Sequence, residues 1–124
     1  MQKLALIGLA GAAGALCRFG MASAVQRLAG PAFPLGTFVV NVTGCLAFGL
    51  LAGLFEGRVQ VSPETRFALL TGFLGAYTTF STYAFESSAL LRDGAWLPAA
   101  LNIGGQVALG LAAVAIGLNL GRAL

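Results

Sequence analysis

Histidine is absent from this sequence of 124 residues, and acidic residues number only four. Histidine is the commonest general base and metal ligand, so the side chain that most acid–base catalysis uses is missing from this protein. The only carboxylates belong to Glu56, Glu64, Glu86 and Asp93. With so few groups that transfer protons, we expect the protein not to be an enzyme.

Cysteine and basic residues are also too sparse for two further classes of function. Cys17 and Cys45 lie in apolar stretches and lack the CxxC or Cys/His spacing of metal and redox sites. Lysine and arginine give a net charge of +3, but they are scattered singly along the chain. Such a pattern does not favour nucleic acid and is typical of helix ends anchored at lipid headgroups.

The sequence has too little polar surface for a protein that is surrounded by water. Hydrophobic residues make up 58% of the chain and charged residues only 9%. This composition predicts a protein embedded in membrane lipid. The length allows a single domain, residues 1–124, of about four helices of roughly 20 residues each.

Four apolar runs predict four transmembrane helices, at about residues 4–26, 35–55, 65–91 and 95–121. The runs are continuous and too long for barrel strands, so they predict an all-α bundle with both termini on one side. Small residues recur at four-residue spacing, which predicts close helix packing. The three sets are Gly49/Gly53, Ala113/Gly117/Gly121 and Gly104/Ala108/Ala112.

The basic residues do not select one orientation in the membrane. One side would carry Lys3, Arg58, Arg66 and Arg122. The other side would carry Arg27 and Arg92. This weak bias fits insertion in both orientations, and it fits a single orientation with a modest preference equally well.

Hydroxyl residues crowd the middle of the third run. Between positions 78 and 82, four of five residues are threonine or serine, and two glycines precede them at Gly72 and Gly75. Hydroxyl side chains beside glycines can loosen helical hydrogen bonding and free backbone carbonyls for a cation or a partner chain. We therefore predict that the third helix is broken near its middle.

Amide side chains stand in the second and fourth runs, where lipid would leave them without partners. Asn41 shares a helix face with Thr37, and Gln106 shares one with Asn102. Amides in hydrocarbon mark a protein interior or a pathway. The amides of the fourth run can line the same route as Asn41 or bond to the third helix, and the sequence leaves both open.

Aromatic and cationic residues add a possible attraction for anions. The positive ring edges of Phe80 and Tyr83 can attract an anion without holding it tightly, although ordinary packing is usually the better explanation of aromatic residues at this spacing. Arg18 is costly within a membrane span unless it snorkels to the surface or serves an electropositive vestibule.

Taken with their order and spacing, these residues resemble the Fluc family of fluoride channels, also called CrcB-like proteins. Residues 14–19, 36–44 and 72–83 with Glu86 carry the resemblance, which covers nearly the whole chain. Its most specific part is Thr-Thr-Phe-Ser-Thr after a GxxG motif, whereas the small residues of the fourth run are unspecific.

The resemblance implies a fold and a function. We expect an antiparallel, dual-topology homodimer in the inner membrane of a prokaryote, with two pores that are each built from both chains. Fluoride would leave the cytoplasm passively through these pores, which lowers its toxicity. The choice of fluoride over chloride comes from the resemblance alone.

The resemblance also implies roles for single residues. The fluoride pore would be lined by Asn41, Phe80, Tyr83, Ser81, Thr82, Glu86 and Gln106, and its vestibule by Arg18 and Thr37. Backbone carbonyls of Gly75 and Thr78 would hold a structural sodium ion at the dimer interface, near Thr79. Two departures from the family pattern are Tyr83 in place of a phenylalanine and Gly110 in place of a hydroxyl residue.

Two other functions remain open at this point. A small multidrug exporter also has four short spans, but proton-coupled cation export needs a carboxylate deep in the first span, and residues 4–26 contain none. A membrane assembly subunit without transport activity is the third possibility. It is favoured only if the purified protein moves no ion.

Overall fold

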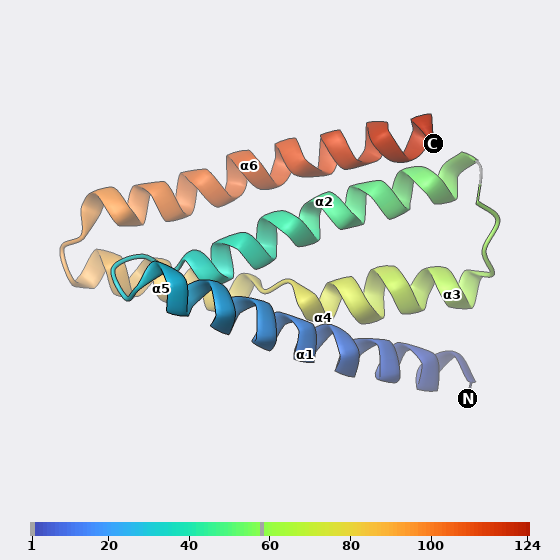
Figure 1. Cartoon of the computed structure of the whole chain (residues 1–124), viewed down its shortest axis with the longest axis horizontal. Coiled ribbons are helices and arrows are strands. Elements are labelled where there is room, and N and C mark those ends of the chain that lie inside the picture. The colour runs from blue at the N-terminus through green and yellow to red at the C-terminus, as the bar shows by residue number, and fades with distance from the viewer. Residues whose placement is uncertain (1, 58) are drawn as a thin grey trace.

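The computed structural model describes residues 2–57 and 59–124, and all regular structure in this part of the chain is helical (Figure 1). Three long helices are α1 (Gln2–Ala29), α2 (Leu35–Gly57) and α6 (Trp96–Ala123). Four shorter segments between α2 and α6 are α3 (Pro63–Phe67), the π-helix η1 (Ala68–Leu74), α4 (Gly75–Tyr77) and α5 (Phe80–Arg92). The all-α prediction is confirmed for these residues. Arg58, used above in the charge comparison, lies outside them.

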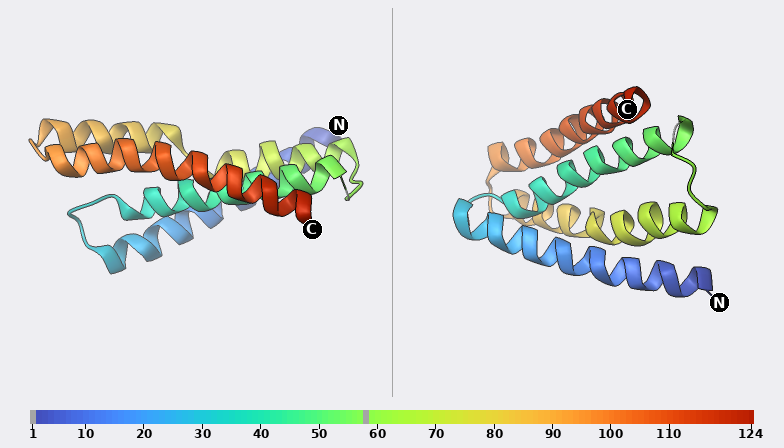
Figure 2. Two further views of the ribbon diagram at one scale, coloured as in Figure 1. Left: turned by 90° about the horizontal axis from the view of Figure 1, so that it is seen from above. Right: turned by 45° about the vertical axis from the view of Figure 1, so that its right-hand side comes forward.

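Three of the helices are long and apolar enough to cross a membrane. They comprise residues 2–29, 35–56 and 96–123, of which the first and last are 28 residues long. At about 1.5 Å of rise per residue, such a helix exceeds the hydrocarbon thickness of about 30 Å. The chain also traverses the molecule between residues 63 and 92, and both termini lie at the same end (Figures 1 and 2).

Glycines bring α2 and α6 into direct backbone contact. A Cβ atom on Gly49 would collide with the backbone of Val114, and one on Gly117 would collide with that of Leu46. Gly53 and Gly121 lie equally close to the opposite helix. Two of the three predicted small-residue sets therefore pack as expected. The third set, Gly104, Ala108 and Ala112, is exposed on the outer side of α6.

Helix α1 packs against α2 and against the η1–α4 segment. Gly14 lies against the backbone of Phe73 in η1, and Gly36 at the start of α2 lies against that of Ala22. Gln26 closes the α1–α2 loop, because its amide accepts a hydrogen bond from the N–H of Gly36 at 3.0 Å. These contacts hold the start of α2 beside α1.

The interior of the bundle is unusually polar. Among fully buried side chains the largest are Val40 and Asn102, whereas many leucines and phenylalanines are exposed. A soluble domain shows the opposite arrangement. The apolar exterior fits contact with lipid or a second chain, and the polar interior contains the candidate site.

Candidate functional site

The helical backbone is interrupted between α4 and α5 at two threonines. Thr78 has φ −83° and ψ 159°, and Thr79 has φ −150° and ψ 113°, which are extended conformations. The hydroxyl of Thr78 donates to the carbonyl of Leu74 at 3.0 Å and so closes α4. The hydroxyl oxygen of Thr79 accepts from the N–H of Thr82 at 3.3 Å, a capping bond that starts α5.

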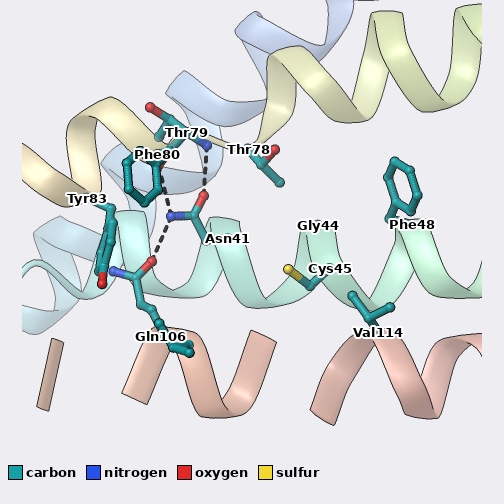
Figure 3. Close-up of a pocket in the computed structure, with 11 residues that line it drawn as sticks. Asn41, Gly44, Cys45, Phe48, Thr78, Thr79, Phe80, Tyr83, Gln106 and Val114 are labelled. Carbon is teal, nitrogen blue, oxygen red and sulfur yellow. Dashed lines mark hydrogen bonds between the residues drawn. The ribbon is translucent and has the colours of Figure 1, made fainter. Parts of the chain in front are cut away.

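Asn41 of α2 binds the backbone at this interruption (Figure 3). Its Oδ1 accepts from the N–H of Thr79 at 2.8 Å, and its Nδ2 donates to the carbonyl of Thr79 at 3.1 Å. The same Nδ2 donates to Oε1 of Gln106 at 2.7 Å. Asn41 therefore satisfies backbone groups that a helix break would otherwise leave unpaired in a water-poor interior.

A series of side-chain hydrogen bonds continues from Gln106 into the protein interior. Gln106 Nε2 donates to Asn102 Oδ1 at 2.9 Å, and Asn102 Nδ2 donates to the hydroxyl oxygen of Ser87 at 2.9 Å. Ser87 in turn donates to the carbonyl of Tyr83 at 2.7 Å. Gln106, Asn102 and Ser87 are 8%, 0% and 5% exposed. The sequence left open whether these two amides line the same route as Asn41 or bond to the third apolar run. Asn102 bonds to Ser87 of that run, and Gln106 bonds to Asn41.

A cavity of about 310 Å³ lies beside this network, between α2, α5 and α6 (Figure 3). The rings of Phe80 and Tyr83 stand at its edge, with centroids 5.5 Å apart and planes inclined by 51°. Phe80 is 78% exposed, so the chain leaves most of this ring uncovered. The cavity is lined by Asn41, Gly44, Cys45, Phe48, Thr78, Thr79, Phe80, Tyr83, Gln106, Val107 and Val114.

A larger hollow of about 650 Å³ opens near the α1–α2 loop and contains Glu86. Glu86 Oε1 accepts from the hydroxyl of Thr37 at 2.8 Å, and Oε2 is buried without a partner among the described residues. Arg27 and Thr82 also line this hollow. Thr37 and Thr82 recur in an adjoining hollow of about 250 Å³, which Arg18 lines as well.

The residues predicted from the sequence thus form two groups that meet at the helix interruption. One group lines the cavity of Figure 3, namely Asn41, Phe80, Tyr83 and Gln106. The other lines the two hollows near the α1–α2 loop, namely Arg18, Thr37, Thr82 and Glu86. Thr79 connects them, because it bonds to Asn41 and its hydroxyl lies 2.9 Å from that of Thr82. The hydroxyl oxygen of Ser81 lies 3.4 Å from the hydroxyl oxygen of Thr79.

Sequence reasoning missed two residues of these sites. Ser87 lies one helical turn after Tyr83, and its position on the polar stripe of α5 was the available signal. Arg27 was treated only as a loop charge, although it lines the same hollow as Glu86. Gly75 and Thr78, the predicted sodium ligands, are exposed and half-buried respectively.

Three apolar helices of spanning length around a polar interior define a multi-pass α-helical membrane protein. Comparison with known families is more specific. The family model described as CrcB-like protein, Camphor Resistance (CrcB) matches residues 5–118, and the chain belongs to this family.

Three similar proteins carry the name fluoride-specific ion channel FluC. The protein of Nitratidesulfovibrio vulgaris (strain Miyazaki F) is 57% identical over 98% of both chains. The protein of Maridesulfovibrio salexigens is 54% identical over 98% of this chain and 97% of its own. That of Nitrosococcus oceani is 51% identical over 98% of this chain and 97% of its own. The similarity therefore extends over almost the whole length of each protein.

Proposed function

We propose that this protein is a fluoride channel that lets fluoride leave the cytoplasm passively and so lowers its toxicity. The observation that carries the proposal is near-full-length identity of 57% to a protein named as a fluoride-specific ion channel. The polar cavity among apolar helices supports it. A channel converts no substrate, so the protein is not an enzyme.

The lining of the cavity suits a small, tightly hydrated anion. Fluoride crossing hydrocarbon needs hydrogen-bond donors at close spacing to replace its water. Asn41 supplies an amide to the cavity at the helix interruption. The hydroxyls of Ser81 and Thr82 lie outside this cavity, within one turn of the start of α5. The ring edges of Phe80 and Tyr83 attract an anion more weakly, which allows it to leave again.

The hollows near the α1–α2 loop are the proposed vestibule. Arg18 and Arg27 provide positive charge there, which raises the local concentration of anions. Thr37 holds Glu86 by a hydrogen bond, which keeps one carboxylate oxygen turned toward α2. An anion would pass from this vestibule along Thr82 toward Asn41.

Besides the three spanning helices, residues 63–92 are a proposed further crossing, third in chain order, with its helical backbone interrupted at Thr78 and Thr79. Each of their helical segments is shorter than a membrane span, but together they run between the two ends of the molecule (Figure 1). Four crossings also agree with the position of both termini at one end (Figure 2).

We propose a structural sodium ion at the backbone carbonyls of Gly75 and Thr78. The helical donor for the carbonyl of Gly75 would be the N–H of Thr79, but this group donates to Asn41 instead. A carbonyl without its helical donor suits a hard cation, which prefers oxygen ligands. The residues present therefore fit such an ion, whose role would be to neutralise carbonyl dipoles between two chains.

An antiparallel homodimer in the inner membrane is the proposed assembly. The exposed ring of Phe80 gives the cavity an incomplete wall, which a second chain can complete. Reporter cysteines in the loop at residues 92–94, on a background lacking Cys17 and Cys45, should label from both sides of intact cells. Labelling from one side alone would contradict dual topology.

Efflux from liposomes tests the proposed function. Purified protein in liposomes loaded with potassium fluoride should release fluoride rapidly on addition of a potassium ionophore, as measured with a fluoride electrode. Liposomes loaded with chloride should release no more than protein-free controls. Equal release of both anions would contradict fluoride selectivity. Release of no ion would favour an assembly subunit, and proton-driven movement of organic cations would favour an exporter.

A further inference from the structure

The buried hydrogen-bond series begins and ends at backbone groups of the same segment. It starts at Thr79, passes through Asn41, Gln106, Asn102 and Ser87, and returns to the carbonyl of Tyr83. The series thereby connects α2, α6 and the first turns of α5. We call its four side chains, Asn41, Gln106, Asn102 and Ser87, the amide relay.

The two backbone ends fix the direction of every bond in the amide relay. The N–H of Thr79 can only donate and its carbonyl can only accept, so the amide of Asn41 has one orientation. Nδ2 of Asn41 then requires an acceptor on Gln106. At the far end the carbonyl of Tyr83 only accepts, so Ser87 donates to it and presents its oxygen to Asn102.

This direction determines what Gln106 presents toward Asn41. Its Nε2 is held by Asn102 at 2.9 Å, so its Oε1 faces Asn41 at 2.7 Å. Reversal of the Gln106 amide would set nitrogen against nitrogen at Asn41 and oxygen against oxygen at Asn102. Because Asn102 and Gln106 are almost completely buried, water cannot compensate for the lost bonds.

We propose that Gln106 is an internal competitor of the anion, and that Asn102 and Ser87 are the residues that position it. The resemblance placed Gln106 in the lining of the pore, where its amide could serve the anion. The geometry assigns it the opposite role, because its oxygen occupies the N–H of Asn41 that fluoride would use. This inference rests on the proposed fluoride channel.

The competition has a direct consequence for conduction. Fluoride that binds at Asn41 exchanges one acceptor for another, so the net gain is smaller than that of a free N–H. Gln106 stays attached to Asn102 during the exchange and returns when the anion leaves. Conduction requires a site of this kind, which binds strongly enough for entry and weakly enough for exit.

Two substitutions separate this role from simple packing. Gln106→Met keeps the length of the side chain but removes the acceptor, so the fluoride concentration that gives half-maximal efflux should fall about tenfold. Ser87→Ala acts outside the cavity, where it removes the acceptor of Asn102 and loosens Gln106. It should lower the same concentration by about threefold. Ser88→Ala is the matched control, because Ser88 is exposed.

The measurement is fluoride efflux from liposomes over a series of fluoride concentrations. A half-saturating concentration that is unchanged or raised in Gln106→Met would overturn the competitor role, and so would a fall in maximal rate alone. If Gln106→Met does not fold, the test is the half-saturating concentration of Ser87→Ala compared with that of Ser88→Ala. A value that is unchanged or raised in Ser87→Ala would overturn the competitor role. If the parent protein moves no fluoride, the proposed channel and this inference are both overturned. If the parent protein moves fluoride but the variants do not change the half-saturating concentration as expected, only the role of the amide relay is overturned.

Discussion

Asn41→Asp is the most informative single substitution, because it changes two bonds and one charge without changing the size of the side chain. The carboxylate keeps an oxygen for the N–H of Thr79, which lies 2.8 Å from Oδ1. Its second oxygen replaces Nδ2 and faces the carbonyl of Thr79 and Oε1 of Gln106, which lie 3.1 and 2.7 Å from that position. Oxygen then opposes oxygen in both places.

The expected effect on transport is much larger than the effect on folding. Two lost hydrogen bonds lower the free energy of unfolding by about 2 kcal/mol, at roughly 1 kcal/mol each. An anion about 4 Å from the new carboxylate is repelled by about 4 kcal/mol at an effective dielectric constant of about 20. This repulsion corresponds to a decrease of about a thousandfold in occupancy of the cavity. Fluoride efflux should therefore fall at least a hundredfold in protein that still folds.

Efflux from liposomes, measured together with size-exclusion chromatography, checks this expectation. Asn119→Asp is the matched control, because Asn119 is exposed on α6 and donates to the carbonyl of Ala115, within its own helix. The control should conduct like the parent protein. Asn41→Asp protein that folds and conducts within about threefold of the parent would refute an anion route past Asn41. A gain in cation movement would refute the choice of an anion as substrate.

Three further substitutions test other parts of the structure. Phe80→Ile should reduce fluoride efflux severely while the protein still folds, because the ring is 78% exposed and its loss removes little packing within the chain; efflux like that of the parent would make the ring a packing residue. Tyr83→Phe should keep or raise efflux, since the hydroxyl bond that it removes, to the carbonyl of Ile103, is long at 3.4 Å. Gly117→Leu should lower the melting temperature and the yield of folded protein, because any Cβ at this position collides with the backbone of Leu46.

Three of the four apolar runs in the sequence correspond to long helices of the structure. Apolar runs without charge have few alternatives in a membrane, so the expected span 35–55 corresponds to Leu35–Gly57 and 95–121 to Trp96–Ala123. Crowded hydroxyl residues predict a break in the third helix, and the structure has extended backbone at Thr78 and Thr79. A single membrane span that is broken at this point stays a prediction. These features depend on local composition, which a single sequence contains in full.

The pairing of polar groups could not be predicted in the same way. Asn41 and Gln106 are 65 positions apart, and only the packing of α2 against α6 brings their amides within 2.7 Å. Whether an amide offers its nitrogen or its oxygen depends on all of its partners, so the sequence alone does not show that Gln106 is an acceptor at Asn41. The sequence contains the residue types but not the direction of a buried network.

The single hydrogen bond from the N–H of Thr79 to Asn41 links the two proposed ion sites. It removes the donor that the carbonyl of Gly75 would have in a continuous helix, and so leaves that carbonyl for a cation. It also fixes the amide of Asn41 with Nδ2 toward Gln106, in the orientation that the proposed anion would use. A continuous helix at Thr78 and Thr79 would restore the carbonyl's partner and release Asn41 at the same time. The extended backbone at Thr78 and Thr79 would therefore supply oxygen ligands for the proposed cation and an oriented N–H for the proposed anion from one backbone position.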